Sequence, residues 1–191
     1  MEDGNKKKEI RLTIVGGSKV GKTAIFKRCL NQEFNEEEEF TQTVVSKTIG
    51  QFTYKNKNYE IYLSDTPKME NKDCENMVLQ YCEFSGGIFL VFDLTEPSSL
   101  KKVENWIDSN NNLCSEKNII ILGNKTDLKR RLGKDIIKNE LQQYENNKII
   151  YMETSAKKNK NIQYAIEAMI DLIEGREPFE DECCHCFKCF W

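Results

Sequence analysis

The amino-acid sequence predicts an α/β protein with a doubly wound, six-stranded, mostly parallel sheet and helices on its faces. Two observations lead to this class. Strand-like apolar segments alternate with helical patterns along most of the 191 residues. Two of those segments, 88–92 and 119–122, are apolar at every position, as expected for strands buried on both faces of a parallel sheet.

The first half of the chain predicts three strands and one short helix. Residues 10–15 form a largely apolar run that ends at two glycines, which predicts a strand followed by a turn. Residues 24–30 predict the short helix. Residues 44–49 and 59–63 predict an antiparallel pair, because the stretch between them holds turn-forming glycine and asparagine.

The second half predicts three helices and completes the sheet. Residues 97–107 form the first helix, which opens at a proline, and residues 135–144 form the second. In residues 162–173 apolar side chains recur every three or four positions, which predicts an amphipathic helix that Gly175 ends. Residues 149–152 supply the sixth strand.

Composition excludes several classes of protein. Hydrophobic residues make up 39% of the chain and only three residues are proline, which excludes disorder over most of its length. The net charge of −3 provides no basic field for nucleic acid. No apolar run approaches the ~18 residues that cross a bilayer. The N-terminus is rich in lysine and glutamate, unlike a signal peptide, so a cytoplasmic protein is expected.

The chain divides into three predicted segments. Residues 1–8 form a flexible basic N-terminus, residues 9–175 a single folded domain, and residues 176–191 a cysteine-rich tail. The four cysteines of the domain are scattered, which predicts reduced thiols rather than a disulfide framework. Three polar stretches, 36–39, 110–112 and 129–131, are expected to be solvated loops.

A phosphate-binding loop is predicted at residues 16–23, which fit G-x-x-x-x-G-K-S/T between a strand and a helix. Glycines let the backbone wrap a polyphosphate, and main-chain N–H groups point at the anion. Lys22 is expected to reach the β- and γ-phosphates, and the Thr23 hydroxyl to ligate Mg²⁺. The flanking strand and helix argue against a chance glycine-rich turn. The candidate binding residues here are Ser18, Lys19, Val20, Gly21, Lys22, Thr23 and Ala24.

A guanine-selective loop is predicted at residues 124–127, which fit N-K-x-D after a strand. The Asp127 carboxylate accepts hydrogen bonds from N1–H and the 2-amino group of guanine, whereas adenine has neither donor there. Such discrimination reaches ~10⁴-fold. The Lys125 stem would lie over the base, and the Ala156 N–H would face the guanine carbonyl. The candidate base-site residues are Asn124, Lys125, Asp127, Ser155, Ala156 and Lys157.

Over about residues 9–175 the chain resembles a Ras-superfamily small GTPase and is most similar to the Rab branch. Ser18, the segment 92–95 (similar to Y-D-V-T) and the helix carrying Trp106 are the Rab-like features. The resemblance implies a six-stranded mixed sheet with five helices and a GTP-binding domain at 9–175. It also implies a monomeric GDP/GTP switch in vesicle traffic or signalling that meets effectors and exchange factors.

The resemblance also implies roles for three further residues. Phe34 matches the aromatic residue that contacts the guanine edge. Thr41 matches the switch threonine that ligates Mg²⁺ only when the γ-phosphate is present. Asp65 matches the D-x-x-G aspartate that holds Mg²⁺ through water. The implied cofactors are therefore GTP or GDP and Mg²⁺.

The second switch departs from the family pattern D-T-A-G-Q, because residues 65–69 are D-T-P-K-M. Lys68 replaces the glycine that contacts the γ-phosphate. Met69 replaces the catalytic glutamine, and a thioether cannot align the attacking water. Pro67 stiffens the segment. Two hypotheses follow: a GTPase with weak hydrolysis, unless Glu70 positions the water, or a nucleotide-stabilised scaffold that barely distinguishes GDP from GTP.

Other departures leave alternatives open. Lys19 replaces a usual glycine of the phosphate loop and either adds positive charge near the phosphates or faces solvent. Ser64 stands where Rab proteins have tryptophan, and residues 42–44 differ from I-G-V.

The tail resembles a lipidated C-terminus only in part. Lys188 occupies the cysteine position of a C-a-a-X box, and the 183–184 cysteine pair lies seven residues before the last residue. Acidic residues at 180–182 oppose anionic lipid. Prenylation at another site, S-palmitoylation aided by aromatic residues, and Zn²⁺ binding remain three alternatives. With a lipidated tail, the protein would associate with the cytosolic face of a membrane.

Overall fold

The protein is built around one six-stranded sheet. The computed structural model describes residues 7–35, 45–67, 72–144 and 149–178. The strands are β1 (Lys8–Gly16), β2 (Val45–Tyr54), β3 (Lys57–Asp65), β4 (Gly87–Asp93), β5 (Asn118–Asn124) and β6 (Ile149–Glu153). Their order is β2-β3-β1-β4-β5-β6. Only β2 and β3 pair antiparallel, which confirms the predicted mixed sheet and its antiparallel pair.

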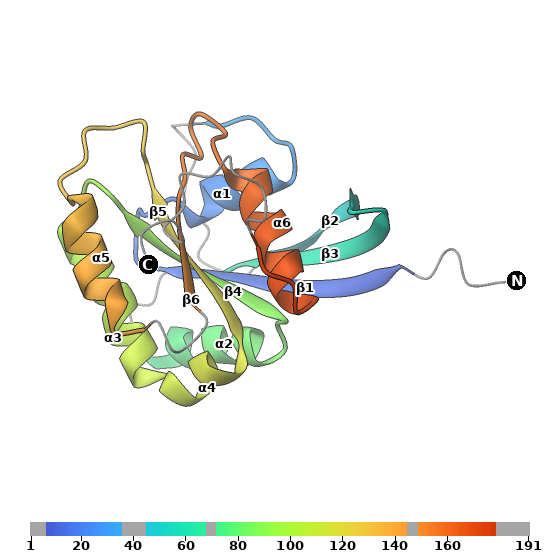
Figure 1. Ribbon diagram of the computed structural model, residues 1–191, viewed down its shortest axis with the longest axis horizontal. Coiled ribbons are helices and arrows are strands. Elements are labelled where there is room, and N and C mark those ends of the chain that lie inside the picture. The colour runs from blue at the N-terminus through green and yellow to red at the C-terminus, as the bar shows by residue number, and fades with distance from the viewer. Residues whose placement is uncertain (1–6, 36–44, 68–71, 145–148, 179–191) are drawn as a thin grey trace, which may run out of the picture.

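Helices cover both faces of the sheet (Figure 1). They are α1 (Lys22–Cys29), α2 (Lys72–Glu83), α3 (Pro97–Ser109), α4 (Asn111–Glu116), α5 (Lys134–Gln142) and α6 (Ile162–Ile173). Helices α1 and α6 pack on one face, and α2, α3, α4 and α5 contribute to the core on the other. Among the described residues, no helix has the length and apolar character needed to span a bilayer.

The alternation of side chains along the strands divides the core into two clusters. In β4, Phe89 and Val91 join the cluster beneath α1 and α6, whereas Ile88, Leu90 and Phe92 join the cluster on the opposite face. All seven residues of β4 are buried. A central parallel strand has no solvent-facing side, which explains why residues 88–92 are apolar throughout.

The structure corrects three sequence predictions. The sequence patterns indicated four helices and the resemblance implied five, whereas the described residues contain six; the patterns did not indicate α2 or α4. Asn111 and Asn112 begin α4 instead of lying in a loop, and the buried Cys114 anchors that helix in the core. Residues 129–131 lie in a loop as predicted, with Lys129 and Arg131 exposed, but Arg130 is partly buried and pairs with Glu153 at 2.7 Å. The stretch 36–39 lies outside the described residues.

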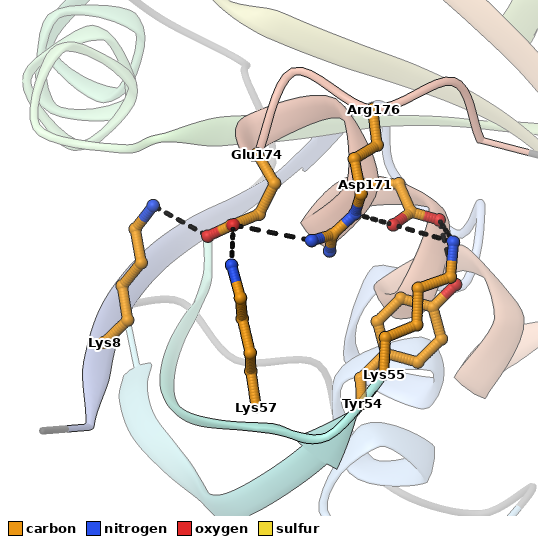
Figure 2. A network of polar contacts seen from close by, with 7 residues as sticks. All are labelled: Lys8, Tyr54, Lys55, Lys57, Asp171, Glu174 and Arg176. Atoms are coloured by element: carbon orange, nitrogen blue, oxygen red, sulfur yellow. Dashed lines mark hydrogen bonds and ion pairs between the residues drawn. The ribbon is translucent and has the colours of Figure 1, made fainter. Parts of the chain in front are cut away.

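A network of polar contacts fastens the end of α6 to the β2–β3 turn (Figure 2). The Asp171 side chain is only 3% exposed. Its carboxylate accepts hydrogen bonds from Tyr54 Oη at 2.8 Å, Lys55 Nζ at 3.2 Å and Arg176 Nε at 2.6 Å. A buried charge needs such partners to offset its lost hydration. The turn, the helix and the chain that follows the helix therefore meet on one carboxylate.

We expect Asp171→Asn to lower the free energy of unfolding by about 3 kcal/mol, because it leaves two cations without their shared counter-charge. Lys57→Ala is the control, since Lys57 is 58% exposed and pairs with Glu174 at the surface. That change should cost less than about 1 kcal/mol. Urea unfolding measures both, and equal effects would contradict the role given to Asp171.

Candidate functional site

A cavity of about 360 Å³ lies at the carboxyl ends of the parallel strands. It is lined by Lys19, Gly21, Lys22, Thr23, Ala24, Lys27, Glu33, Phe34, Asn35, Asn124, Lys125, Asp127, Leu128, Ala156 and Lys157. Most of the residues expected at the phosphate and base sites are in this set. The loops after β1, β5 and β6 form the wall together with α1 and the segment that follows it, so segments distant in sequence share one cavity.

The remaining candidate residues lie around this cavity or outside the described chain. Val20 and Ser155 are buried and outside the set of residues that line the cavity, and Ser18 is exposed. Thr41 and Met69 lie outside the described residues. The sequence argument did not anticipate Lys27, Glu33, Asn35 or Leu128, because these residues belong to no motif and reach the cavity only through the fold.

At Gly21, the backbone of the phosphate loop adopts a conformation that only glycine fits. Its φ is +99°, in the left-handed region, and a Cβ there would lie 2.3 Å from Asn124 Nδ2. The residue precedes α1, whose first turn faces the cavity through Lys22, Thr23 and Ala24. Main-chain N–H groups at such a helix start favour an anion.

Lys22 is held inside the loop that it follows. Its ammonium donates to the carbonyls of Gly16 at 2.9 Å and Gly17 at 2.8 Å. Burial lowers the pKa of Lys22 to about 8, and the neighbouring Asp65 carboxylate limits the fall. The loop thus carries a largely desolvated cation beside the cavity, where a phosphate would find a counter-charge.

Thr23 and Asp65 place two oxygen groups together at the phosphate end. Thr23 Oγ1 donates to Asp65 Oδ2 at 2.7 Å, and Asp65 is fully buried at the end of β3. Mg²⁺ prefers hard oxygen ligands and usually keeps waters and phosphate oxygens in its shell. A hydroxyl and a carboxylate in this position fit such an ion.

Asn124 connects three loops at the base side. Its Nδ2 donates to the Val20 carbonyl at 2.9 Å, and its Oδ1 accepts from Thr154 Oγ1 at 3.3 Å and from the Ala156 N–H at 3.1 Å. The Ala156 N–H, expected to face a guanine carbonyl, is therefore bonded to Asn124 here, since a buried N–H requires a partner. Ala156 itself still lines the cavity.

The walls of the base side are set by three further contacts. Ser155 Oγ donates to Asp127 Oδ1 and accepts from the Lys158 N–H at 3.0 Å, which orients the Asp127 carboxylate. Lys157 Nζ lies 6.0 Å from the centre of the Phe34 ring, so the segment after α1 meets the loop after β6. Arg28 Nε donates to the Ala156 carbonyl at 2.8 Å and holds this loop against α1.

Lys19 is exposed to solvent, and it also belongs to the set of residues that line the cavity. Its backbone is left-handed, with φ of 60°, where most phosphate loops of this pattern have glycine. The Lys19 residue is therefore exposed to solvent at the rim of the cavity.

Comparison with known proteins identifies the class. The Ras family profile matches residues 11–175, so this chain belongs to the Ras family of small GTPases. It is 30% identical over 186 residues to the Ras-related protein Rab-27A of Mus musculus, covering 92% of this chain and 83% of that protein. It is 28% identical over 187 residues to Rab-27B of Bos taurus, covering 92% and 84%. The predicted superfamily and Rab likeness are confirmed, and the family implies guanine-nucleotide binding.

We expect Gly21→Ala to destabilise the protein by about 1–3 kcal/mol, because the new Cβ meets the Asn124 amide and the backbone is left-handed. Gly86→Ala is the matched control: a Cβ there meets nothing closer than 3.5 Å. It should change stability by no more than about 0.5 kcal/mol. Thermal unfolding compares the two, and a neutral Gly21→Ala would refute the close fit between the loops.

Proposed function

We propose that this chain is a Rab-like GDP/GTP molecular switch with slow intrinsic hydrolysis, acting in vesicle traffic or signalling. One observation carries the nucleotide part of this proposal. The phosphate loop and the N-K-x-D loop meet through the Asn124–Val20 hydrogen bond and wall a single cavity. An anion site and a purine-selective carboxylate in one cavity suit a guanosine polyphosphate.

In this proposal, different residues of the site bind the phosphates, the guanine base and the metal ion. Lys22 and the N–H groups from Lys19 to Ala24 hold the phosphates, and Asp127 accepts from the N1–H and 2-amino groups of guanine. Phe34 and the Lys125 stem flank the base. Thr23 would hold Mg²⁺ together with Asp65, the latter through water, and Thr41 would join them when a γ-phosphate is bound. The metal would neutralise charge on the β- and γ-phosphates.

Slow hydrolysis follows from Met69, which lies outside the described residues. Hydrolysis requires a water aligned with the bond between the γ-phosphorus and the bridging oxygen. A glutamine amide can orient that water through hydrogen bonds, whereas a thioether offers only a weak acceptor. The phosphate loop would still bind GTP, so this chain would bind the nucleotide but hydrolyse it slowly.

We expect single-turnover GTP hydrolysis by the pure protein to stay below ~10⁻⁴ s⁻¹, the order of magnitude of the intrinsic rate of Ras. Met69→Gln should raise the rate about tenfold or more, because a positioned water is restored. Met77→Gln is the control, as Met77 is an exposed methionine on α2. Rapid hydrolysis by the unaltered chain would show that another group, such as Glu70, aligns the water.

A nucleotide-stabilised scaffold is the second candidate, and the start of the second switch favours it. Thr66 Oγ1 donates to the Ile14 carbonyl at 2.7 Å, and both Thr66 and Pro67 are buried. Pro67 fixes its own φ, and Lys68 lacks the freedom of the glycine it replaces. A segment fastened in this way would respond little to the γ-phosphate.

Hydrogen exchange of the main-chain amides distinguishes the two candidates. For a switch, exchange in α2 should slow when GDP is replaced by a slowly hydrolysed GTP analogue, because the γ-phosphate orders the segment. For a scaffold, the two forms should exchange alike. Exchange in α5, which contributes no residue to the lining of the cavity, serves as the internal control. Identical α2 exchange in both forms would exclude the switch.

Partners and location complete the proposal. Effectors and exchange factors would bind a monomer, in the cytoplasm or on the cytosolic face of a membrane reached through a lipidated tail. Residues 179–191 of the tail, which hold its four cysteines, lie outside the described residues, so these cysteines enter this proposal through the sequence alone. The intact mass of protein from its native cell distinguishes prenylation, palmitoylation, bound Zn²⁺ and an unmodified tail.

A further inference from the structure

Asp93 ends β4 and belongs to neither the phosphate loop nor the N-K-x-D loop, yet its side chain contacts a lysine of the second loop whose ammonium also bonds the first. The side chain is only 9% exposed, and it pairs with Lys125 at 2.6 Å. We propose that Asp93 is a positioning residue for nucleotide retention: it holds the Lys125 ammonium so that this group fastens the base loop to the phosphate loop. The inference rests on the proposed guanine-nucleotide site.

The Lys125 ammonium lies between two oxygen atoms from different parts of the fold. It contacts Asp93 Oδ2 at 2.6 Å and donates to the Lys19 carbonyl at 2.8 Å. The first atom belongs to the sheet and the second to the phosphate loop. A charge-assisted pair is shorter and stronger than a neutral hydrogen bond, so the carboxylate fixes where the ammonium lies. The Lys125 stem then has a set path along the cavity wall.

The backbone at both ends of this bridge is strained. Lys19 has φ of 60° and Lys125 has φ of 70°, the left-handed region that costs non-glycine residues energy. Such conformations persist where surrounding contacts enforce them. The Lys125 ammonium links the two residues directly, because it donates a hydrogen bond to the Lys19 carbonyl. Without Asp93, that bridge would lose its fixed anchor.

Asp93 is itself held in place. Its Oδ1 accepts from the Thr95 N–H at 2.8 Å and from Thr95 Oγ1 at 2.7 Å. It lies beside Asn124 in the β4–β5 register, so the anchor adjoins the base loop. Burial alone would raise the pKa of Asp93, but the hydrogen bonds from Lys125 and Thr95 outweigh it and hold that pKa below its usual value. The group is therefore anionic at neutral pH.

A purely structural role for Asp93 has a different signature. The Asp93–Thr95 bonds form a local turn after β4, and losing that turn would destabilise the protein without acting through Lys125. Glu104 offers a matched comparison, because its side chain is 3% exposed and pairs with Lys101 at 2.8 Å in α3. It is a buried carboxylate with one lysine partner, outside the set of residues that line the cavity.

The test measures GDP dissociation from the full chain, with a fluorescent GDP analogue, for Asp93→Asn, Glu104→Gln and Lys125→Met. Asp93→Asn should speed dissociation about tenfold, because a charge-assisted contact is lost. Glu104→Gln should leave the rate unchanged. Lys125→Met keeps the stem but removes the ammonium, so adding Asp93→Asn to it should have no further effect. Asp93→Glu should restore part of the loss.

Hydrogen exchange of the phosphate loop in the GDP-bound protein gives a second readout. Asp93→Asn should speed exchange across residues 16–21, and Glu104→Gln should not. Equal dissociation rates for Asp93→Asn and the unaltered chain, or additive effects of Asp93→Asn and Lys125→Met, would overturn this inference while leaving the proposed function intact. An unaltered chain with no affinity for guanine nucleotides would overturn both.

Discussion

The hydrogen bonds of the Asn124 side chain are the constraint on which the site depends. One amide bonds the phosphate loop through Val20 and the loop after β6 through Thr154 and Ala156. Asn124 is buried at the end of β5, so these bonds form away from competing water. Asn124 therefore holds the phosphate loop and the loop after β6 against the end of one strand, and both loops line the cavity.

The buried charged groups at the two ends of the sheet have different kinds of partner. At the carboxyl ends of the parallel strands, Lys22 bonds neutral carbonyls of its own loop and has the Asp65 carboxylate nearby, and burial lowers its pKa. An incoming phosphate would supply further counter-charge. At the opposite end, Asp171 already has two cations and a phenol around it. The first arrangement suits a ligand, whereas the second joins fixed elements.

The motif residues of the phosphate and base loops could be predicted because their chemistry is local. A loop that wraps phosphate needs glycine at Gly21, a lysine after it and a strand before it, and these lie within one short segment. The strands could be predicted because a central parallel strand is apolar at every position. The same reasoning missed α4, since its short, asparagine-rich segment has no clear apolar repeat and is secured by the burial of Cys114.

The sequence by itself determined the class of fold, the order of strands and helices along the chain and the two nucleotide-binding motifs, because each depends on residues that are neighbours in the sequence. Only the tertiary structure decided that Arg28 braces the loop after β6 and that Asp93 meets Lys125. Neither contact can be predicted from the spacing of residues along the sequence, since each joins residues that the order of strands in the sheet brings together. Side-chain partners across a sheet depend on topology and register, which no local pattern encodes.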